Sequence, residues 1–452
     1  MSRIARHLLA GLVISLAASA PRATAADASP PQTIGPNKEQ LLAQAQQCRE
    51  LLRTSLIQFY LPACVDQANG GYLESLRDGK FALTGEKLLT LQARQLWFFS
   101  TLAIEGYESE RALAAARSGF SFIQTKMRDA QNGGYYSKVT DEGGPRDPRK
   151  HAYLNSFALY GLTAYYRATK APEALQAAQE LFRVLEAKSH DKKHGGYVEF
   201  FEADWTPITD PKASGYVGAI GHKTYNTHLH LLESFAELYR VWPDEILGRR
   251  LSELLTINAS TVRYPTVNNN VDAYFADWKV VKEPRNLRAS YGHDVECVWL
   301  VMDAARTLSL SPALYRTWAE ALCRTCLDLG YDREHGGFYS SGPLGQPADD
   351  TQKIWWVQSE ALAGMLEMFR LTGNVEYYSA FSRTLDFCAK YQVAKEGSWW
   401  ASRNADGSPT NNLQRSSPWQ GAYHGGRAMI LCAKWLEELA GLAQNHAKDT
   451  QR

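Results

Sequence analysis

Two histidines of this sequence have neighbours that would suit acid–base chemistry. His293 and Glu296, in the segment GHDVE, are three residues apart, so they share one face if the segment is helical. A carboxylate beside an imidazole orients the ring and raises its basicity, which is typical of a general base. His424 is followed by two glycines that would let the backbone approach a ligand. The sequence lacks the HExxH spacing of a zinc site, so we expect no metal.

Three further segments place polar residues inside apolar stretches, where burial is unfavourable unless the residues are paired or used. Arg94 in QARQLW would bind a substrate oxygen or form a structural ion pair. Asn226 and His230 in NTHLH share one helix face, and such a histidine could equally be a satisfied core residue. In WWVQSE, Trp356 and Glu360 would form a stacking surface with a hydrogen-bond acceptor, or would pack in the core.

The elements that position these residues are predicted to be helices in a repeated arrangement. Asp, three residues, Gly-Gly and an aromatic residue recur in copies that begin at Asp66, Asp129, Asp191 and Asp332. The spacing predicts a degenerate copy around residues 268–278, and GSWW at 397–400 resembles a sixth. Between the copies, apolar residues recur at helical intervals, with room for two helices per period. Six helix pairs could form an open solenoid, but a closed all-α (α/α)6 barrel buries both layers without caps.

The ends of the sequence predict an exported protein. Residues 1–25 combine early arginines, a short apolar run and a small-x-small cleavage pattern, which are features of a signal peptide. We expect residues 26–40 to be a linker and residues 41–445 to be one helical domain, periplasmic or secreted. The net charge of +1 gives no footprint for nucleic acid, and no later apolar run is long enough to span a membrane.

Seven cysteines are an odd number, so they cannot all pair within one chain. Cys48 and Cys64 are close enough in sequence to consider a disulfide. Cys323 and Cys326 form a CxxC, which could be a disulfide or part of a metal site. The helical periodicity around that CxxC favours buried free thiols.

Taken together, the chain from about residue 45 to 440 resembles the N-acylglucosamine 2-epimerase family, and within it the cellobiose 2-epimerases most. The segments that carry the resemblance are QARQLW, NTHLH, GHDVE, WWVQSE and PWQGAYHGGR, in that order. The resemblance implies an (α/α)6 barrel with the active site in its mouth, no cofactor and a mono- or disaccharide substrate.

The resemblance also implies a role for each residue. His293 and His424 would be acid and base at carbon 2, on opposite faces of the sugar, and Glu296 would orient His293. Arg94 would hold the oxygen on which enediolate charge develops. Asn226 and His230 would contact the sugar, with His230 helping to open the ring. The remaining substrate-binding residues would be Trp356, Trp419, Tyr423 and Glu360.

The implied reaction converts glucose to mannose configuration at the reducing end of a β-1,4 disaccharide such as cellobiose or mannobiose. A monosaccharide aldose–ketose isomerase or an N-acylglucosamine 2-epimerase is the alternative, because the same enediolate protonated at carbon 1 gives a ketose. An (α/α)6 glycoside hydrolase would need two opposed carboxylates, whereas the distinctive motifs contain histidines. A non-catalytic sugar-binding scaffold is a further alternative.

The chain departs from the cellobiose 2-epimerases beside His424. Those enzymes usually have Asn after this histidine, where this chain has Gly425. Their preceding run Trp-Lys-Cys-Pro-Tyr-His is WQGAYH here. These differences bear on the substrate more than on the reaction.

Overall fold

The structure, a computed structural model, describes residues 35–449, with side chains as far as residue 442. The expected signal peptide and most of the expected linker lie outside the described residues. Residues 38–40, the end of that expected linker, are helical instead. The reason is local: Asn37 and Gln40 each accept a hydrogen bond from the other's backbone N–H at 2.9 Å, a capping box that starts helix α1 at Lys38.

Five helices of the described range, and the first two turns of a sixth, α13, are buried on nearly every side, and we call these six the central helices. Ordinary surface helices bury one stripe only, so buried residues all around a helix place it in an interior. The first fourteen residues of α5, for example, are all buried. The central helices are α3 (Leu89–Ile104), α5 (Ala152–Thr169), α7 (Tyr225–Tyr239), α9 (Tyr291–Thr307), α11 (Trp355–Thr372) and α13 (Tyr423–Asp449).

A second set, the flanking helices, buries a single stripe. In α8 the buried residues are Leu247, Leu251, Leu254 and Leu255, which is the spacing of one helix face. The flanking helices are α1 (Lys38–Leu51), α4 (Ser109–Phe122), α6 (Pro172–Lys188), α8 (Glu245–Thr256), α10 (Arg316–Leu329) and α12 (Val375–Phe387). The short α2 (Gln58–Tyr60) follows a π-helical turn at Leu52–Ile57.

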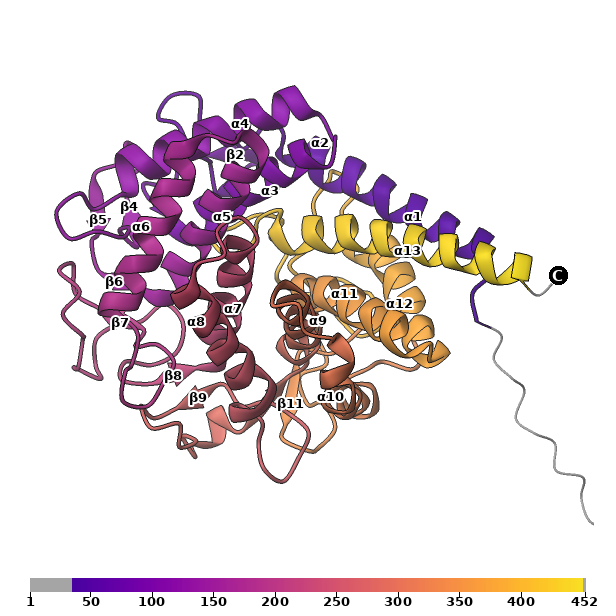
Figure 1. The fold of residues 1–452 in the computed structure, drawn as a ribbon. Helices are drawn as coiled ribbons and strands as arrows, with labels where there is room; N and C mark the ends of the chain where they lie inside the picture. The colour runs from indigo at the N-terminus through magenta and orange to yellow at the C-terminus, as the bar shows by residue number, and fades with distance from the viewer. Residues whose placement is uncertain (1–34, 450–452) are drawn as a thin grey trace, which may run out of the picture. The chain divides into compact units, whose positions relative to one another are not determined.

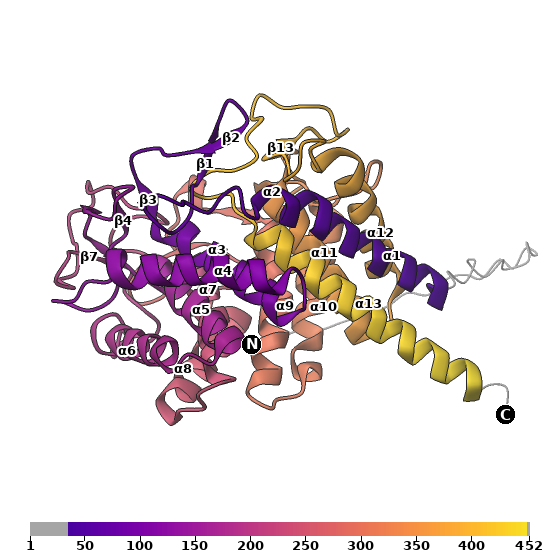
Figure 2. The same cartoon turned by 90° about the horizontal axis from the view of Figure 1, so that it is seen from above.

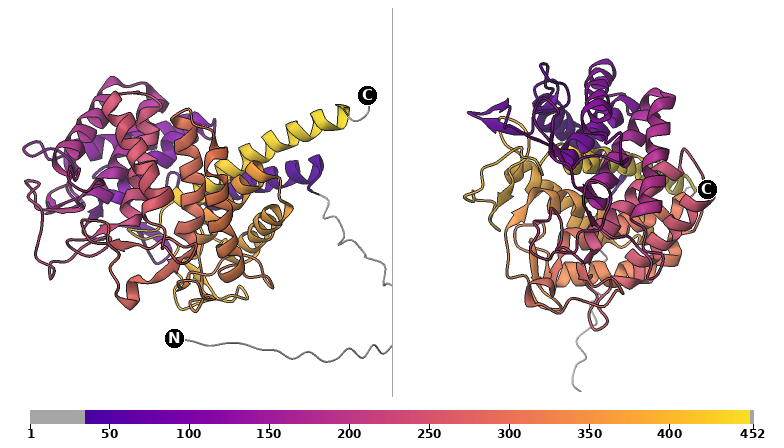
Figure 3. Two further views of the ribbon diagram at one scale, coloured as in Figure 1. Left: turned by 60° about the horizontal axis from the view of Figure 1, so that its bottom comes forward. Right: turned by 90° about the vertical axis from the view of Figure 1, so that its left-hand side faces the viewer.

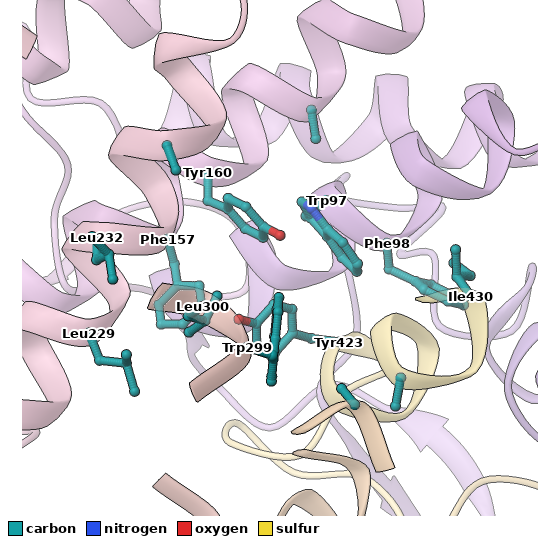
Figure 4. Close-up of a cluster of buried hydrophobic side chains, with 14 of the residues drawn as sticks. Trp97, Phe98, Phe157, Tyr160, Leu229, Leu232, Trp299, Leu300, Tyr423 and Ile430 are labelled. Atoms are coloured by element: carbon teal, nitrogen blue, oxygen red, sulfur yellow. The ribbon is translucent and has the colours of Figure 1, made fainter. Parts of the chain in front are cut away.

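Each central helix packs against the next one along the chain, and α13 also contacts α3. Each flanking helix contacts the central helix that precedes it, except that α1 pairs with α13 from the other end of the chain; Figures 1 and 2 show these two side by side. Between the central helices lies a core with many aromatic rings (Figure 4), in which Tyr423 is 5.5 Å from Trp97 and 5.4 Å from Phe157 between ring centroids.

Short antiparallel strands precede the central helices, and Figure 3 shows them with the long loops at one end of the helices. The pairs are β1 (Ser75–Arg77) with β2 (Lys80–Ala82), β6 (Lys150–His151) with β7 (Phe200–Phe201), β8 (Lys223–Thr224) with β9 (Ala273–Tyr274), β10 (Arg288–Ser290) with β11 (Ser341–Pro343), and β12 (Lys353–Ile354) with β13 (Ser402–Arg403). The strands β3 (Lys87–Leu88), β4 (Lys138–Val139) and β5 (Pro145–Asp147) form a three-stranded sheet.

The four complete Asp–Gly–Gly–aromatic copies are tight turns. Equivalent turns at 263–270 and 393–399 lack the full motif, and the first of these begins before the stretch 268–278 that the spacing predicted. The residue before each copy forms a bridge with the aromatic position, as between Arg128 and Tyr135, and the degenerate copy does so between Arg263 and Asn270. Gly133 and Gly134 have φ values of 76° and 68°, which glycine adopts without strain.

In each of the four complete turns, a buried lysine bonds the aspartate of the turn. The sequence analysis did not predict these lysines. Lys150 Nζ lies 2.8 Å from Asp129 Oδ2, and the equivalent pairs are Asp66 with Lys87, Asp191 with Lys223 and Asp332 with Lys353. The fourth residue of the next central helix then bonds the aromatic position: Gln92 of α3 accepts from Tyr72 N and donates to Tyr72 O, both at 2.8 Å. The turns therefore fix where each central helix begins.

All seven cysteines are free and buried, which confirms the reading of the CxxC as buried thiols and leaves no disulfide between Cys48 and Cys64. Among the described residues, no helix has both the length and the apolar character needed to cross a membrane.

Candidate active site

A cavity of about 270 Å³ lies where the central helices begin. Its position follows from the turns, because residues two or three places into a central helix reach the same end. It is lined by Arg94, Tyr153, Tyr216, Val217, Asn226, His230, His293, Trp355, Trp356, Trp419 and His424. A larger, open groove of about 740 Å³ between the β1–β2 hairpin and residues 411–416 contains neither histidine nor carboxylate. The smaller cavity is therefore the candidate site.

Seven of the ten residues that the sequence singled out line this cavity. They come from five central helices and one loop, and they are Arg94, Asn226, His230, His293, Trp356, Trp419 and His424. The Trp356 ring contacts both proposed catalytic histidines, with ring centroids 4.6 Å from His293 and 5.9 Å from His424. The structure thus brings the two histidines to one tryptophan, although 131 residues separate them in the chain.

His424 is held by a carboxylate from another helix. Its Nδ1 lies 2.6 Å from Glu360 Oε1, and Trp299 Nε1 donates to Glu360 Oε2 at 3.0 Å. Burial raises the pKa of Glu360 above its usual 4.5, and the hydrogen bonds from Arg427 and Trp299 oppose that rise. Burial, reinforced by Arg94 and Arg427, lowers the pKa of His424 well below 6.5. A neutral His424 whose Nδ1–H donates to Glu360 carries its lone pair on Nε2.

His293 has a different environment. It is half-buried, and within the described residues its ring makes aromatic contacts but no hydrogen bond. Burial, together with His230 and Arg94, lowers its pKa to about 3. His293 is therefore neutral over the physiological range and able to accept a proton.

His230 is the third histidine of the cavity, and it too has a carboxylate partner. Its Nδ1 lies 3.0 Å from Glu233 Oε2. Burial lowers the pKa of His230, and the bond to Glu233 opposes this shift. Glu233 also accepts from the Tyr423 hydroxyl at 2.7 Å. His230 thus lines the cavity and has its ring held by Glu233.

Beneath the cavity, one buried arginine gathers three carboxylates. Arg427 Nη2 lies 2.6 Å from Glu296 Oε1 and 2.8 Å from Glu360 Oε1, and its Nη1 donates to Glu233. Glu296, Glu360 and His424 have ligand atoms close enough together to hold a cation. The guanidinium already bonds two of these three residues, so the group does not fit a metal ion.

Arg94 and Asn226 keep unused hydrogen-bonding atoms at the cavity. Arg94 Nη2 donates to the Tyr153 hydroxyl at 2.9 Å, but its Nε has no partner among the described residues. The same holds for Asn226 Oδ1. A buried polar atom without a partner is unfavourable, so such atoms mark places where a ligand would bond.

Three predicted site residues have other positions than expected. Glu296 does not orient His293: it pairs with Arg427, because a buried carboxylate gains more from a fixed cation than from a neutral imidazole. Glu360 and Tyr423, expected to contact substrate, lie behind the cavity lining at 1% exposure each. Glu360 takes the role that was expected of Glu296, on the other histidine.

Sequence reasoning missed Glu233, Trp299, Tyr153 and the role of Arg427. Glu233 is three residues after His230, the same spacing that singled out Glu296, so a signal for it was present. Arg427 lies within the PWQGAYHGGR segment. Its three partners come from three different helices, so no spacing in the sequence points to them.

The cavity brings together three histidines, two of them bonded to carboxylates, an arginine and tryptophan rings, and these groups are suited to acid–base catalysis. The N-acylglucosamine 2-epimerase (GlcNAc 2-epimerase) family model matches residues 70–427. The chain belongs to this family. It is a carbohydrate 2-epimerase, an enzyme of the isomerase class.

Individual relatives cover most of the chain. The cellobiose 2-epimerase of Bacteroides fragilis is 31% identical over 401 residues, which are 85% of this chain and 97% of that protein. The structure of cellobiose 2-epimerase from Bacillus thermoamylovorans B4167 superposes with a TM-score of 0.79 at 29% identity, over 88% of this chain and 99% of that one. The N-acylglucosamine 2-epimerase of Rattus norvegicus is 22% identical over 401 residues, 85% of this chain and 90% of that protein.

Proposed function

We propose that this enzyme interconverts glucose and mannose configurations at the reducing end of a β-1,4 disaccharide such as cellobiose or mannobiose. The observation that carries the proposal is the placement of His293 and His424 around Trp356 in one cavity. The similarity to enzymes named cellobiose 2-epimerase supports the disaccharide. The half-exposed Trp419 would stack on the second sugar, because it lines the cavity at 37% exposure.

In the proposed mechanism the sugar first opens to its aldehyde, with His230 assisting. One histidine removes the carbon 2 proton as a neutral base, which the lowered pKa values of His293 and His424 support. Arg94 stabilises the enediolate oxygen through its guanidinium. The other histidine returns a proton to the opposite face of carbon 2. The donor histidine starts this step as an imidazolium and ends neutral, while the base histidine gains the carbon 2 proton and ends as an imidazolium. The total charge of the pair is therefore unchanged, and proton exchange with solvent resets it.

We also propose that the helices form an (α/α)6 barrel. The contacts that run from α3 through each central helix to α13 and back to α3 support it, as does the pairing of each central helix with one flanking helix. This arrangement would place the cavity in the mouth of the barrel, with the turns around its rim.

Nuclear magnetic resonance in deuterated water tests the reaction. The enzyme is incubated with cellobiose, mannobiose, mannose, glucose and N-acetylglucosamine. We expect deuterium at carbon 2 and the 2-epimer from the β-1,4 disaccharides. Ketose as the only product would favour an aldose–ketose isomerase, and turnover of N-acetylglucosamine alone would favour that sugar. Released monosaccharides would indicate a hydrolase, although no carboxylate lines the cavity.

The catalytic histidines are tested by His293→Asn and His424→Asn. Each replacement removes a proton-transfer group and keeps much of the side-chain shape, so carbon 2 exchange should fall by about 10²-fold or more. His335→Asn is the matched control, because His335 does not line the cavity. Unchanged exchange in both site variants would leave a non-catalytic scaffold, or other catalytic residues, as the explanation.

A further inference from the structure

Arg427 connects two of the three cavity histidines without lining the cavity itself. It is 2% exposed in the second turn of α13 and absent from the cavity wall. Through Glu233 it reaches His230, and through Glu360 it reaches His424. His293 is outside this chain of bonds. One guanidinium therefore supports both histidine–carboxylate pairs.

The charges in this cluster make the arginine necessary to the carboxylates. Three buried carboxylates face one cation, and such groups stay ionised only when they are compensated. Burial would raise the pKa of Glu233, yet Arg427 and His230 hold it at about 2. Burial and the charge of Glu360 raise the pKa of Glu296 well above 4.5, and its Oε2 has no partner among the described residues. The arginine thus keeps Glu233 and Glu360 available as hydrogen-bond acceptors.

We infer that Arg427 is a positioning residue for the proposed reaction: it holds Glu233 and Glu360 so that His230 and His424 keep one tautomer and one orientation. A lysine cannot replace it, because an ammonium is a compact point charge, whereas the planar guanidinium bonds several carboxylates in fixed directions. The inference rests on the proposed function in one respect, namely that these histidines act on the substrate.

The charged and titratable groups around the cluster come from all six central helices. They include Arg94 from α3, Tyr153 and Tyr160 from α5, His230 and Glu233 from α7, His293 and Glu296 from α9, Glu360 from α11, and Tyr423, His424 and Arg427 from α13. On the opposite side, Arg167, Glu237, Arg240 and Asp303 line a further cavity together with Arg427. Arg427 lowers the pKa of both Glu233 and Glu360. Its removal raises both values, so these carboxylates become protonated at a higher pH than in the unchanged enzyme.

Arg427→Met and Arg427→Lys test the inference with the carbon 2 exchange assay. We expect kcat to fall by about 10²-fold in the methionine variant, on the scale of lost acid–base catalysis, with KM within about threefold. The lysine variant should recover only part of kcat. In the methionine variant the acid limb of the pH–kcat profile should move to higher pH, because Glu360 and Glu233 lose their compensating charge. In the lysine variant, which keeps a positive charge, this limb should move less.

Arg370→Met is the matched control. Arg370 is also an arginine on a central helix that pairs with a buried carboxylate, Glu367, but it touches none of the cavity histidines. Its loss should leave the pH profile unchanged. A shifted profile in this control as well would mean that the shift reports general loosening of the helices.

Chemical rescue separates positioning from folding. A second cavity of about 230 Å³, at the other end of the central helices, is lined by Arg427, Trp299 and Trp435 among others, so a small cation can reach the site of a truncated Arg427. In Arg427→Ala, millimolar guanidinium should restore kcat at least fivefold, and equal sodium chloride should not. Circular dichroism checks that each variant is folded.

Two results would overturn the inference. One is a folded Arg427→Met with unchanged kcat and pH profile. The other is a loss of kcat with no pH shift and no rescue by guanidinium, which would indicate a purely structural arginine. Failure of the proposed function looks different, because the unchanged enzyme itself would then exchange no carbon 2 proton in any sugar.

Discussion

The proposed catalytic histidines differ in what holds them. His424 is bonded to a carboxylate that is itself held by Trp299 and Arg427. His293 has only ring contacts, with Trp356 and Tyr225. A positive charge on His424 would be stabilised by the bonded Glu360 carboxylate. A positive charge on His293 would have to be stabilised by substrate or solvent, because no described carboxylate bonds its ring. The two imidazoles are therefore unequal as acids.

Glu360→Gln tests whether Glu360 supports His424 through its charge or contacts the sugar directly. The amide keeps the shape but loses the charge that supports a protonated His424, so kcat for carbon 2 exchange should fall by about 10²-fold with KM little changed. Steady-state kinetics checks this, with Glu438→Gln, an exposed partner of Arg370, as the control. Equal effects on KM and kcat in Glu360→Gln would point to a direct contact with the sugar instead.

The spacing of His293 and Glu296 led to a pairing that the fold does not make. A three-residue spacing shows that two side chains share a helix face, but it says nothing of what other helices bring to that face. Arg427, which lies on α13, forms an ion pair with the Glu296 carboxylate. The same spacing in His230 and Glu233 does form a bond, although Glu233 also bonds Arg427 and Tyr423.

At the scale of the element, the repeated turn positions the residues that line the cavity. The buried lysine bonds the turn's aspartate, as Lys87 does with Asp66, and also the first glycine carbonyl, Gly70 O, at 2.7 Å. The next helix then starts at a fixed distance from the turn. Its second and third residues, such as Asn226 and His293, consequently reach the cavity. Catalytic geometry here depends on pairs that lie outside the active site.

Lys150→Met tests this element. Removing one partner of a buried ion pair leaves Asp129 uncompensated, so the free energy of unfolding should fall by about 3–5 kcal/mol. Lys279→Met removes an exposed lysine paired with Asp277 and should change the free energy of unfolding far less, because solvent screens an exposed ion pair. Urea unfolding measures both. Similar losses in the two variants would contradict the role of the buried pair.

At the scale of the whole molecule, the cyclic series of helix contacts links both ends of the described chain. The pairing of α1 with α13 gives the last central helix, which carries His424 and Arg427, its flanking partner. The active site thus draws on residues from 94 to 427.

The four aspartate–lysine pairs predict acid sensitivity of the whole fold. Burial opposes ionisation of these aspartates, but the lysine and backbone hydrogen bonds more than offset it, so each pKa lies below the usual 3.8. Burial also lowers the pKa of Lys150, and this offsets part of the stability that the ion pair with Asp129 contributes.

A lowered pKa in the folded state means that the stability from these aspartates is complete above about pH 4 and is lost as pH falls through the folded values. We expect the urea midpoint to drop progressively as the pH falls below about 4. Asp129→Asn should show a shallower dependence than the unchanged chain. An identical slope in that variant would exclude the pair as a source of acid sensitivity.

The features that depend on neighbouring residues could be predicted from the amino-acid sequence. Helical periodicity, the recurring glycine turns and the buried thiols follow from properties of neighbouring residues, and each is found in the structure. The distinctive motifs also identified seven residues of the cavity. Which carboxylate bonds which histidine became evident only from the packing of the helices. Glu233, Glu296 and Glu360 lie on separate helices, and all three bond Arg427. Burial makes those long-range pairs obligatory, and no short-range spacing encodes them.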